Sequence, residues 1–176
     1  MKYKRYLHNP PHIFVDDTYY FLTAATYKKR RHFDTTEKRD FLEKCIIRIF
    51  HKYGWELTEY VIFDNHYHIK GKSKNGKEMP LIFRDIHRDT SNYLKRKGVK
   101  MGLKIWWNYW DILIHNLDQY EFYTYYIWLN PVKHGYVYDS AQWKWMKLEN
   151  VEEMGEDRSK EILGNKELIN KIYDDF

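Results

Sequence analysis

The chain has 176 residues, enough for one ordinary domain with a sizeable core and too few for a multidomain machine. Hydrophobic residues make up 43% and charged residues 31%, and no apolar run approaches the roughly 20 residues that span a bilayer, so we expect no membrane contact. The single cysteine, Cys45, excludes an intrachain disulfide and a thiolate zinc cage, and no signal peptide is recognisable, so a cytoplasmic location is expected.

The net charge of +5 is unevenly distributed along the chain. Residues 1–148 carry +10, whereas residues 149–176 carry −5. We therefore expect one domain over residues 1–148 and an acidic appendage over residues 149–176. Excess cation attracts phosphates, and an aromatic fraction of 19% offers stacking surfaces for unpaired bases. Core packing and solubility explain the same numbers, so composition alone leaves both interpretations open.

Four strands and three helices are expected from the pattern of apolar residues. The strands are expected at 18–27, 55–63, 66–72 and 107–115, and the helices at 34–54, 80–98 and 118–130, with a further short helix near 166–173. The order β-α-β-β-α-β-α predicts an α+β, ferredoxin-like (split βαβ) fold, in which helices pack on one face of an antiparallel sheet and a C-terminal helix is added.

Helix starts and stops have their own signals. Asp34 with Glu37, and Asp118 with Glu121, are spaced as capping boxes. Pro131 should end or kink the last helix, because proline disfavours helical geometry in the residue before it.

Two histidines on the third predicted strand are candidate metal ligands. His66 and His68 are two residues apart, so both imidazoles point from the same face of the sheet, and each offers a nitrogen lone pair to a divalent metal. A surface hairpin with two exposed rings is the alternative for this short motif taken alone.

The last predicted helix adds a candidate nucleophile. Tyr126 and Asn130 are four residues apart and share one helix face, so a phenol and an amide oxygen could both approach the histidines. A free phenol has a pKa near roughly 10 and is a poor nucleophile at pH 7, so it needs a metal on the phosphate and nearby cations. A core or surface tyrosine is the alternative, since the chain has 17 tyrosines.

Taken together, these two segments resemble a known family. Residues 61–68, with His66-Tyr-His68, resemble the His-hydrophobic-His hairpin of the HUH endonucleases. Residues 125–137 resemble the tyrosine helix of their single-tyrosine transposases, especially the REP-associated tyrosine transposases. The aromatic first strand and residues 104–120 match in order, so the resemblance covers roughly residues 15–140.

The resemblance implies a metal-dependent enzyme that cuts and transfers single-stranded DNA. By it, His66, His68 and Asn130 would bind Mg²⁺ or Mn²⁺, and Tyr126 would attack a phosphodiester to give a 5′-phosphotyrosine and a free 3′-hydroxyl. Tyr126 is preferred to Tyr125, because it directly precedes the Ile-x-x-Asn-Pro pattern and shares a helix face with Asn130. Reversal by an incoming 3′-hydroxyl would transfer the strand without ATP.

The chain departs from the family pattern at two places. Asp64 stands where the family commonly has proline, and we interpret it as shaping the turn, with a carboxylate near the metal as the alternative. The strand after His68 reads Ile-Lys-Gly-Lys where the family is usually apolar, and its two lysines are predicted to hold the DNA backbone, with a solvated strand end as the alternative. The cations and one histidine expected to contact DNA are Lys28, Lys29, Arg30, Arg31, Lys70, Lys72, Lys95, Arg96, Lys97, Lys133 and His134.

The expected partner is single-stranded or hairpin DNA, bound by a monomer or a homodimer. Trp106, Trp107 and Trp110 could stack on bases, or pack in the core. A domesticated binder of structured single-stranded DNA or RNA that does not cut is the alternative function, and a metal-dependent phosphohydrolase for small substrates is a third. The acidic appendage is expected to fold back on the basic surface or to compete with DNA for it.

Overall fold

The computed structural model describes residues 12–149, which form an α+β fold with one five-stranded antiparallel sheet. The strands are β1 (Tyr19–Thr26), β2 (Glu56–Ile62), β3 (His66–Lys72), β4 (Trp106–Leu113) and β5 (Met146–Lys147), and the helices are α1 (Thr36–Lys52), α2 (Met79–Arg96) and α3 (Leu117–Lys133). The sheet order is β4-β1-β3-β2-β5. The predicted fold class and element order are confirmed, and the two-residue β5 is the strand that was not predicted. The acidic appendage and its expected helix lie outside the described residues.

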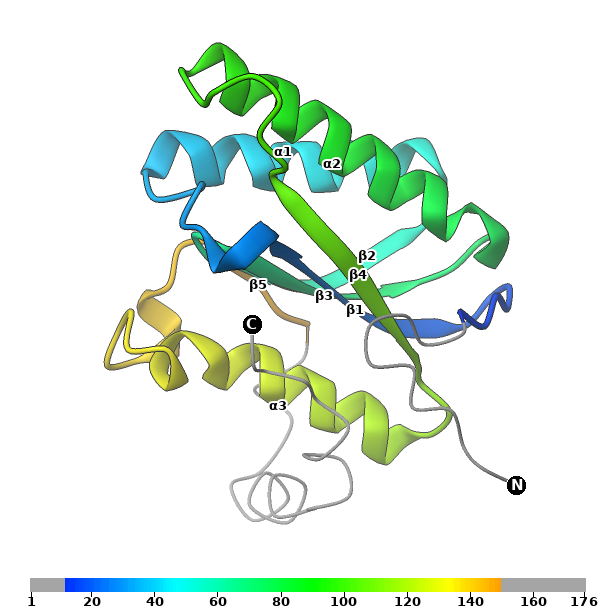
Figure 1. Ribbon diagram of the computed structural model, residues 1–176. Helices are drawn as coiled ribbons and strands as arrows, with labels where there is room; N and C mark the ends of the chain where they lie inside the picture. The colour runs from blue at the N-terminus through cyan, green and yellow to red at the C-terminus, as the bar shows by residue number, and fades with distance from the viewer. Residues whose placement is uncertain (1–11, 150–176) are drawn as a thin grey trace, which may run out of the picture.

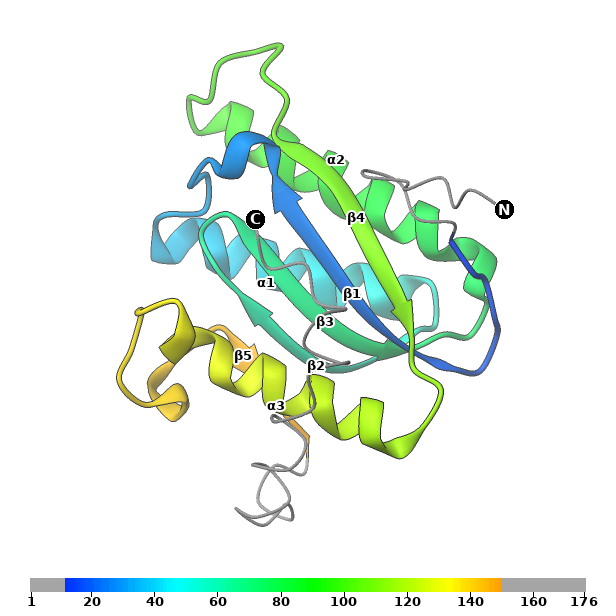
Figure 2. The ribbon, with the colours of Figure 1, turned by 60° about the horizontal axis from the view of Figure 1, so that its bottom comes forward.

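The sheet separates two helical layers. Helices α1 and α2 cover one face, and α3 crosses the other (Figure 1). On that second face α3 runs beside β2, and β4, at the other edge of the sheet, is the strand farthest from it (Figure 2). Along β3, Tyr67 meets Phe83 and His87 of α2, whereas the next residue, His68, meets Tyr126 of α3. Side chains alternate along a strand, so each residue of β3 belongs to one layer or the other.

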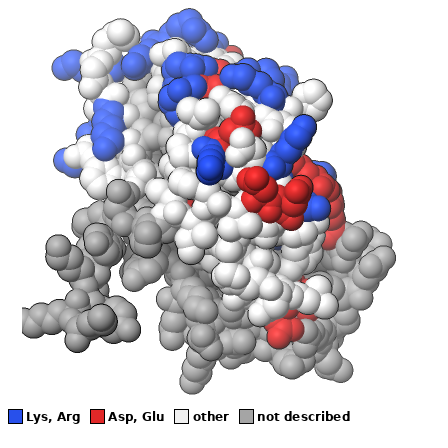
Figure 3. Space-filling view, turned by 90° about the vertical axis from the view of Figure 1, so that its right-hand side faces the viewer, with Lys and Arg blue, Asp and Glu red and all other residues white. Residues whose placement is uncertain are grey.

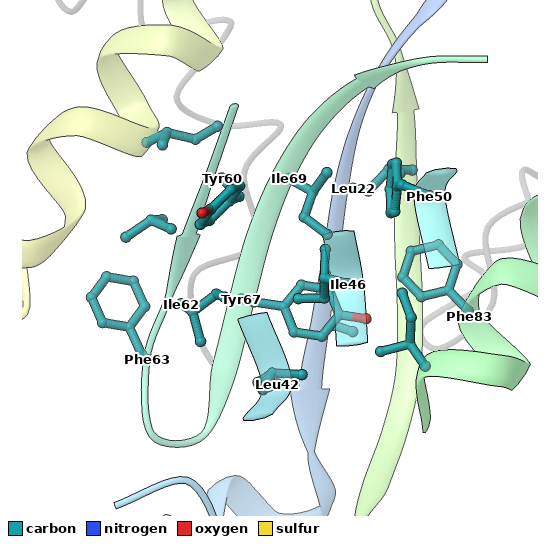
Figure 4. Packing of buried hydrophobic residues seen from close by; sticks show 14 of the residues in the cluster. Leu22, Leu42, Ile46, Phe50, Tyr60, Ile62, Phe63, Tyr67, Ile69 and Phe83 are labelled. Atoms are coloured by element: carbon teal, nitrogen blue, oxygen red, sulfur yellow. The ribbon is translucent and has the colours of Figure 1, made fainter. Parts of the chain in front are cut away.

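The main core lies between the sheet and the α1–α2 layer. Ile69 and Tyr67 of β3 and Leu22 of β1 lie against Leu42 and Ile46 of α1 (Figure 4). All five side chains are fully buried. Burying a large apolar side chain contributes about 1.5–3 kcal/mol, so this layer stabilises the sheet that holds the site.

Helix boundaries differ from prediction in detail. Thr35, not Asp34, is the N-cap of α1, and Asn116, not Asp118, is the N-cap of α3, where its side chain accepts a hydrogen bond from the backbone N–H of Gln119. Both helices thus begin close to the expected residues, but a neighbouring side chain takes the cap.

The predicted end of α3 at Asn130, before Pro131, is wrong, because the helix continues to Lys133. Pro131 lies in the last turn of α3, and only two residues of the helix follow it. Gly135 then ends it with φ +71°, while its N–H donates to Val132 O and the Tyr136 N–H donates to Pro131 O. This is a Schellman C-cap, in which glycine adopts the left-handed conformation without a steric cost.

Candidate active site

Two histidines of β3 form the centre of the site. His66 and His68 lie on the sheet face that α3 crosses, and their ring centroids are 5.1 Å apart. Both side chains are buried. The prediction that they share one face of the sheet is confirmed, and the alternative of two exposed rings on a surface hairpin is excluded.

A neighbouring side chain orients each imidazole through Nδ1. His66 Nδ1 lies 2.7 Å from Asn65 Oδ1, and His68 Nδ1 lies 2.8 Å from Thr23 Oγ1. An amide oxygen only accepts, so His66 Nδ1 donates its proton and the lone pair lies on Nε2. Histidines that bind metals are commonly oriented in this way by a second hydrogen bond.

Burial keeps both imidazoles neutral. It lowers the pKa of His66 to about 3, and the positive charges of His134 and Lys133 act in the same direction. Burial likewise lowers the pKa of His68 well below its ordinary value. Neutral imidazoles are the form that donates a lone pair to a metal, so the electrostatics of the site suit ligation at neutral pH.

Helix α3 brings the predicted nucleophile and the amide to these histidines. The ring of Tyr126 meets the ring of His68 edge-on, with centroids 5.2 Å apart, and His134, just after the helix, lies 5.0 Å from His66. Asn130 is four residues from each of these contacts and therefore shares their helix face. Its Nδ2 donates to the backbone oxygen of Tyr126 at 2.7 Å. The tyrosine, the amide and the two histidines thus gather at one place.

Two buried oxygen atoms in this place are without a hydrogen-bond partner among residues 12–149. They are Tyr126 Oη and Asn130 Oδ1. A buried polar atom without a partner costs about 1–3 kcal/mol, so native structures keep few of them and those few call for an explanation. A phenol oxygen can meet a phosphate, and an amide oxygen can meet a cation, so both atoms suit a bound phosphodiester and its counter-ion.

The donor set fits a divalent cation. Within the described part of the chain, no group of three His, Cys, Asp or Glu side chains could hold a metal, so a cation at this site would also need the amide of Asn130. Two neutral imidazole nitrogens and one amide oxygen make an open set, which leaves room for water and phosphate oxygens. The unsatisfied oxygen of Asn130 is the observation that favours ligation over simple packing.

The prediction that Lys70 contacts DNA is wrong. Strand alternation does place it on the face of the histidines, but α3 covers that part of the strand and the side chain is fully buried. Its ammonium lies 2.8 Å from Glu59, which is also fully buried, and it donates to Thr124 of α3. The lysine therefore binds α3 to the sheet rather than DNA to the protein. Lys72, at the far end of β3 from His66, is half-buried, and its DNA-binding role stays a prediction.

The other predicted contacts lie in three places. Lys133 and His134 adjoin the site at the end of α3, with Lys133 Nζ 5.2 Å from the ring centroid of Tyr126. The exposed segment 28–31 follows β1, and its Arg31 forms an ion pair with Asp64 beside the histidine hairpin. The segment 95–97 ends α2 in the layer behind the sheet. The structure brings the first two groups toward the site and leaves the third in the opposite layer.

The cations of the α1–α2 layer are interspersed with acids. On the face shown in Figure 3, Lys and Arg gather over this layer with Asp and Glu beside them. Arg48 pairs with Asp89 at 2.7 Å, Lys52 with Asp85 at 2.7 Å, and Arg88 contacts both aspartates. Much of the positive charge in this layer is therefore already neutralised.

The residues that position the histidines carry little signal in the sequence. Thr23 gave no signal, because its role depends on the pairing of β1 with β3, which places it opposite His68. Asn65 lies between the second and third predicted strands, where a turn is expected, and its position next to His66 is the one hint that the sequence offers. Glu59 and Thr124 were missed for the same reason as Thr23: they meet Lys70 only in the tertiary structure.

The chain is similar to several known proteins. The family model described as "Transposase IS200 like" matches residues 15–113, which include both histidines and end before α3. A REP-associated tyrosine transposase from Escherichia coli (strain K12) is 25% identical over 144 residues, covering 81% of this chain and 79% of that protein. A solved structure of a REP-associated tyrosine transposase bound to a REP hairpin has a similar fold, with a TM-score of 0.65, 24% identity, and coverage of 83% of this chain and 81% of that one.

Between residues 12 and 149, none of the helices has the length and apolar character needed to cross a bilayer.

Proposed function

Because the chain belongs to the IS200-like transposase family, we propose that it is a metal-dependent single-stranded DNA endonuclease and strand transferase that acts through a phosphotyrosine. The observation that carries the proposal is the meeting of Tyr126 and Asn130 with the neutral pair His66 and His68, with one unsatisfied buried oxygen on each of the first two. Its substrate would be a single strand next to a DNA hairpin, as the hairpin in the structure of the similar transposase suggests.

The proposed step is a transesterification at phosphorus. Tyr126 Oη forms a bond to the phosphorus as its proton leaves to solvent, and the bond from phosphorus to the 3′ oxygen breaks. The 3′ oxygen takes up a proton and becomes a hydroxyl, while the 5′ side stays on the enzyme as a phosphotyrosine. The number of phosphoester bonds is unchanged, so an incoming 3′-hydroxyl can reverse the step without an external energy source.

The chain's own residues favour this attack. Lys133 Nζ lies 5.2 Å from the ring centroid of Tyr126, so its positive charge favours the negative charge that develops on the phenol oxygen. Phe21 and His68 stack on each other and both meet the phenol ring edge-on, at centroid distances of 5.6 and 5.2 Å, which limits its rotation. His66, His68 and Asn130 would hold Mg²⁺ or Mn²⁺. When bound, that cation would offset charge on the phosphate oxygens.

The test is detection of a covalent adduct with a labelled oligonucleotide. With Mn²⁺ or Mg²⁺ and single-stranded DNA that flanks the gene, the protein should retain label through denaturing electrophoresis, and EDTA should remove this activity. Tyr126→Phe should abolish the adduct while DNA binding stays within about twofold. Tyr125→Phe is the matched control, because this neighbouring tyrosine is also buried on α3. An adduct that persists in Tyr126→Phe would refute the assignment.

A binding module that does not cut is the second candidate. It would show hairpin affinity that falls steeply with salt, no metal requirement, and no adduct with any oligonucleotide. The segment 28–31 and Lys133 beside the site favour DNA binding under either function. The adduct assay therefore separates the two candidates, whereas a binding assay alone does not.

A further inference from the structure

A partly exposed aromatic pair lies at the edge of the sheet, outside the site described above. Trp107 of β4 is 41% exposed, and its ring stacks on Tyr27 with centroids 5.2 Å apart and an interplanar angle of 29°. The ammonium of Lys104 lies 4.1 Å from the centroid of the Trp107 ring and 5.3 Å from that of Tyr27. We call these three residues the Trp107 platform. Trp106, by contrast, is buried and donates its Nε1–H to Thr90, so it belongs to the core.

A bulge in β4 turns Trp107 toward the face of the histidines. Ala24 pairs with Tyr109 and Thr26 pairs with Trp106, so two residues of β4, Trp107 and Asn108, stand opposite the single residue Ala25. Bulges commonly redirect a side chain at the edge of a functional site. Trp106 stacks on His87 in the α2 layer. Trp107 stands opposite Ala25 in the bulge and therefore faces the other side of the sheet, where α3 lies.

The same register places the platform next to the active site. On its other side Ala25 pairs with His66 of β3. The order across the sheet is therefore Trp107, Ala25, His66, and two strand spacings put the backbones of Trp107 and His66 about 10 Å apart. Ala25 carries only a methyl group, so no large side chain of the sheet stands between the indole and the imidazole.

Close to the platform in the sequence lie cations that form no salt bridge with any acid among residues 12–149. Lys28, Lys29 and Arg30 follow Tyr27 directly and are exposed, and none of the salt bridges within residues 12–149 involves them or Lys104. This differs from the α1–α2 layer, where Asp85 and Asp89 pair with the cations. Lys28 and Lys29 also have φ of +57° and +54°, a backbone conformation that residues other than glycine rarely adopt. Backbone strain of this kind is concentrated at ligand-binding segments.

We propose that the Trp107 platform binds one unpaired base of the DNA strand beside the scissile phosphate. The base stacks on the indole of Trp107, beside Tyr27, and Lys104 binds the neighbouring phosphate. Both contacts are favourable, because the indole offers a flat surface to the base and the ammonium meets a full opposite charge. This inference rests on the proposed function, because it needs a single strand that passes through the active site.

The test is a scan with abasic nucleotides in the non-cleaving Tyr126→Phe background. A single-stranded oligonucleotide from the DNA flanking the gene is labelled, one abasic nucleotide is moved along it, and affinity is measured by fluorescence anisotropy. Removal of the base that stacks should weaken binding about fivefold to 100-fold, the range for one base on one aromatic side chain. Trp107→Ala should weaken binding of the intact strand by a similar factor and should no longer respond to that abasic position.

Matched variants separate stacking from loss of structure. Trp107→Phe keeps a smaller ring and should retain part of the abasic response. Ile47→Ala removes a comparably exposed apolar side chain from α1, on the opposite side of the sheet, and should change affinity less than twofold. Thermal unfolding of each variant shows whether it is folded.

The outcomes distinguish this inference from the proposed function. A wild-type adduct together with an unchanged abasic profile in folded Trp107→Ala would overturn the platform and leave the function intact. If Trp107→Ala changes the abasic profile but the wild type forms no adduct, the result would support the platform and favour the binding module. Equal loss of affinity at every abasic position would also overturn the inference, because it would indicate charge attraction without a stacking site.

Discussion

The buried ion pair between Lys70 and Glu59 leads to the sharpest prediction about stability. The ammonium of Lys70 lies 2.8 Å from Glu59, 3.3 Å from the backbone oxygen of Tyr120 and 3.3 Å from the centroid of the Tyr120 ring. Burial raises the pKa of Glu59 and lowers that of Lys70 to about 8, and each charge offsets part of the effect on the other. The perturbation is Lys70→Met, which keeps the length of the side chain and removes its charge.

The expected cost follows from what the substitution leaves behind. Both side chains are fully buried, so Glu59 would keep a buried carboxylate whose remaining side-chain hydrogen bond among residues 12–149 comes from Thr124, at 3.0 Å. Removing one partner of a buried pair typically costs about 3–5 kcal/mol, whereas replacing both partners with apolar groups is often neutral or stabilising. Lys70→Met should therefore destabilise the fold by about 3 kcal/mol, and Lys70→Met with Glu59→Leu should recover most of that loss.

Urea unfolding followed by circular dichroism measures these differences. Lys72→Met is the matched control, because Lys72 lies two residues along the same strand with its side chain only half-buried, and its cost should stay within about 0.5 kcal/mol. If Lys70→Met costs less than about 1 kcal/mol, or if the double variant is less stable than the single one, the account of Lys70 as a buried link between α3 and the sheet is wrong.

Two further predictions concern stability alone. Burial lowers the pKa of His87 to about 3, so between that value and its unfolded pKa near 6.5 only the unfolded chain binds the proton, and stability falls as the pH decreases through this window. From pH 7.0 to 5.5 the wild type should lose about 1 kcal/mol more than His87→Phe in urea titrations, and parallel pH profiles would contradict this. Asn116→Ala should cost about 1 kcal/mol because it removes the N-cap of α3, whereas Asp118→Ala should cost less, since Asp118 lies in the first turn and leaves the cap in place. Thermal unfolding compares the two variants. A larger effect of Asp118→Ala would contradict this prediction and indicate that Asp118 caps α3, as the sequence suggested.

Much of the fold could be predicted because its elements have strong local signals. The β-branched runs and the helical spacing of apolar residues are properties of short segments, and they place six elements within two residues of their observed bounds and the end of α3 within three. Boundaries were less predictable where neighbours compete for one role. Thr35 and Asp34 can both cap α1, and the choice depends on the backbone conformation that the preceding loop adopts.

The site was predictable only in its residues, not in its surroundings. His66 and His68 share a face by strand alternation, and Tyr126 and Asn130 share a face by helical periodicity, so local geometry was sufficient for each pair. The meeting of the two pairs came from the family resemblance and not from the residues alone. Thr23, Glu59 and Trp107 take their roles from cross-strand register or from the bulge in β4, which no short segment encodes.

Lys70 marks the limit most clearly. The sequence by itself determined which face of β3 this lysine occupies, because side chains alternate along a strand regardless of what packs on them. Whether that face meets DNA or protein depended on where α3 crosses the sheet, and this is decided by packing between segments that lie far apart in the chain. The tertiary structure places α3 over Lys70 and next to the histidines, with Trp107 on the same face beyond β1, so one lysine is buried while the neighbouring part of that face brings together the residues of the proposed site.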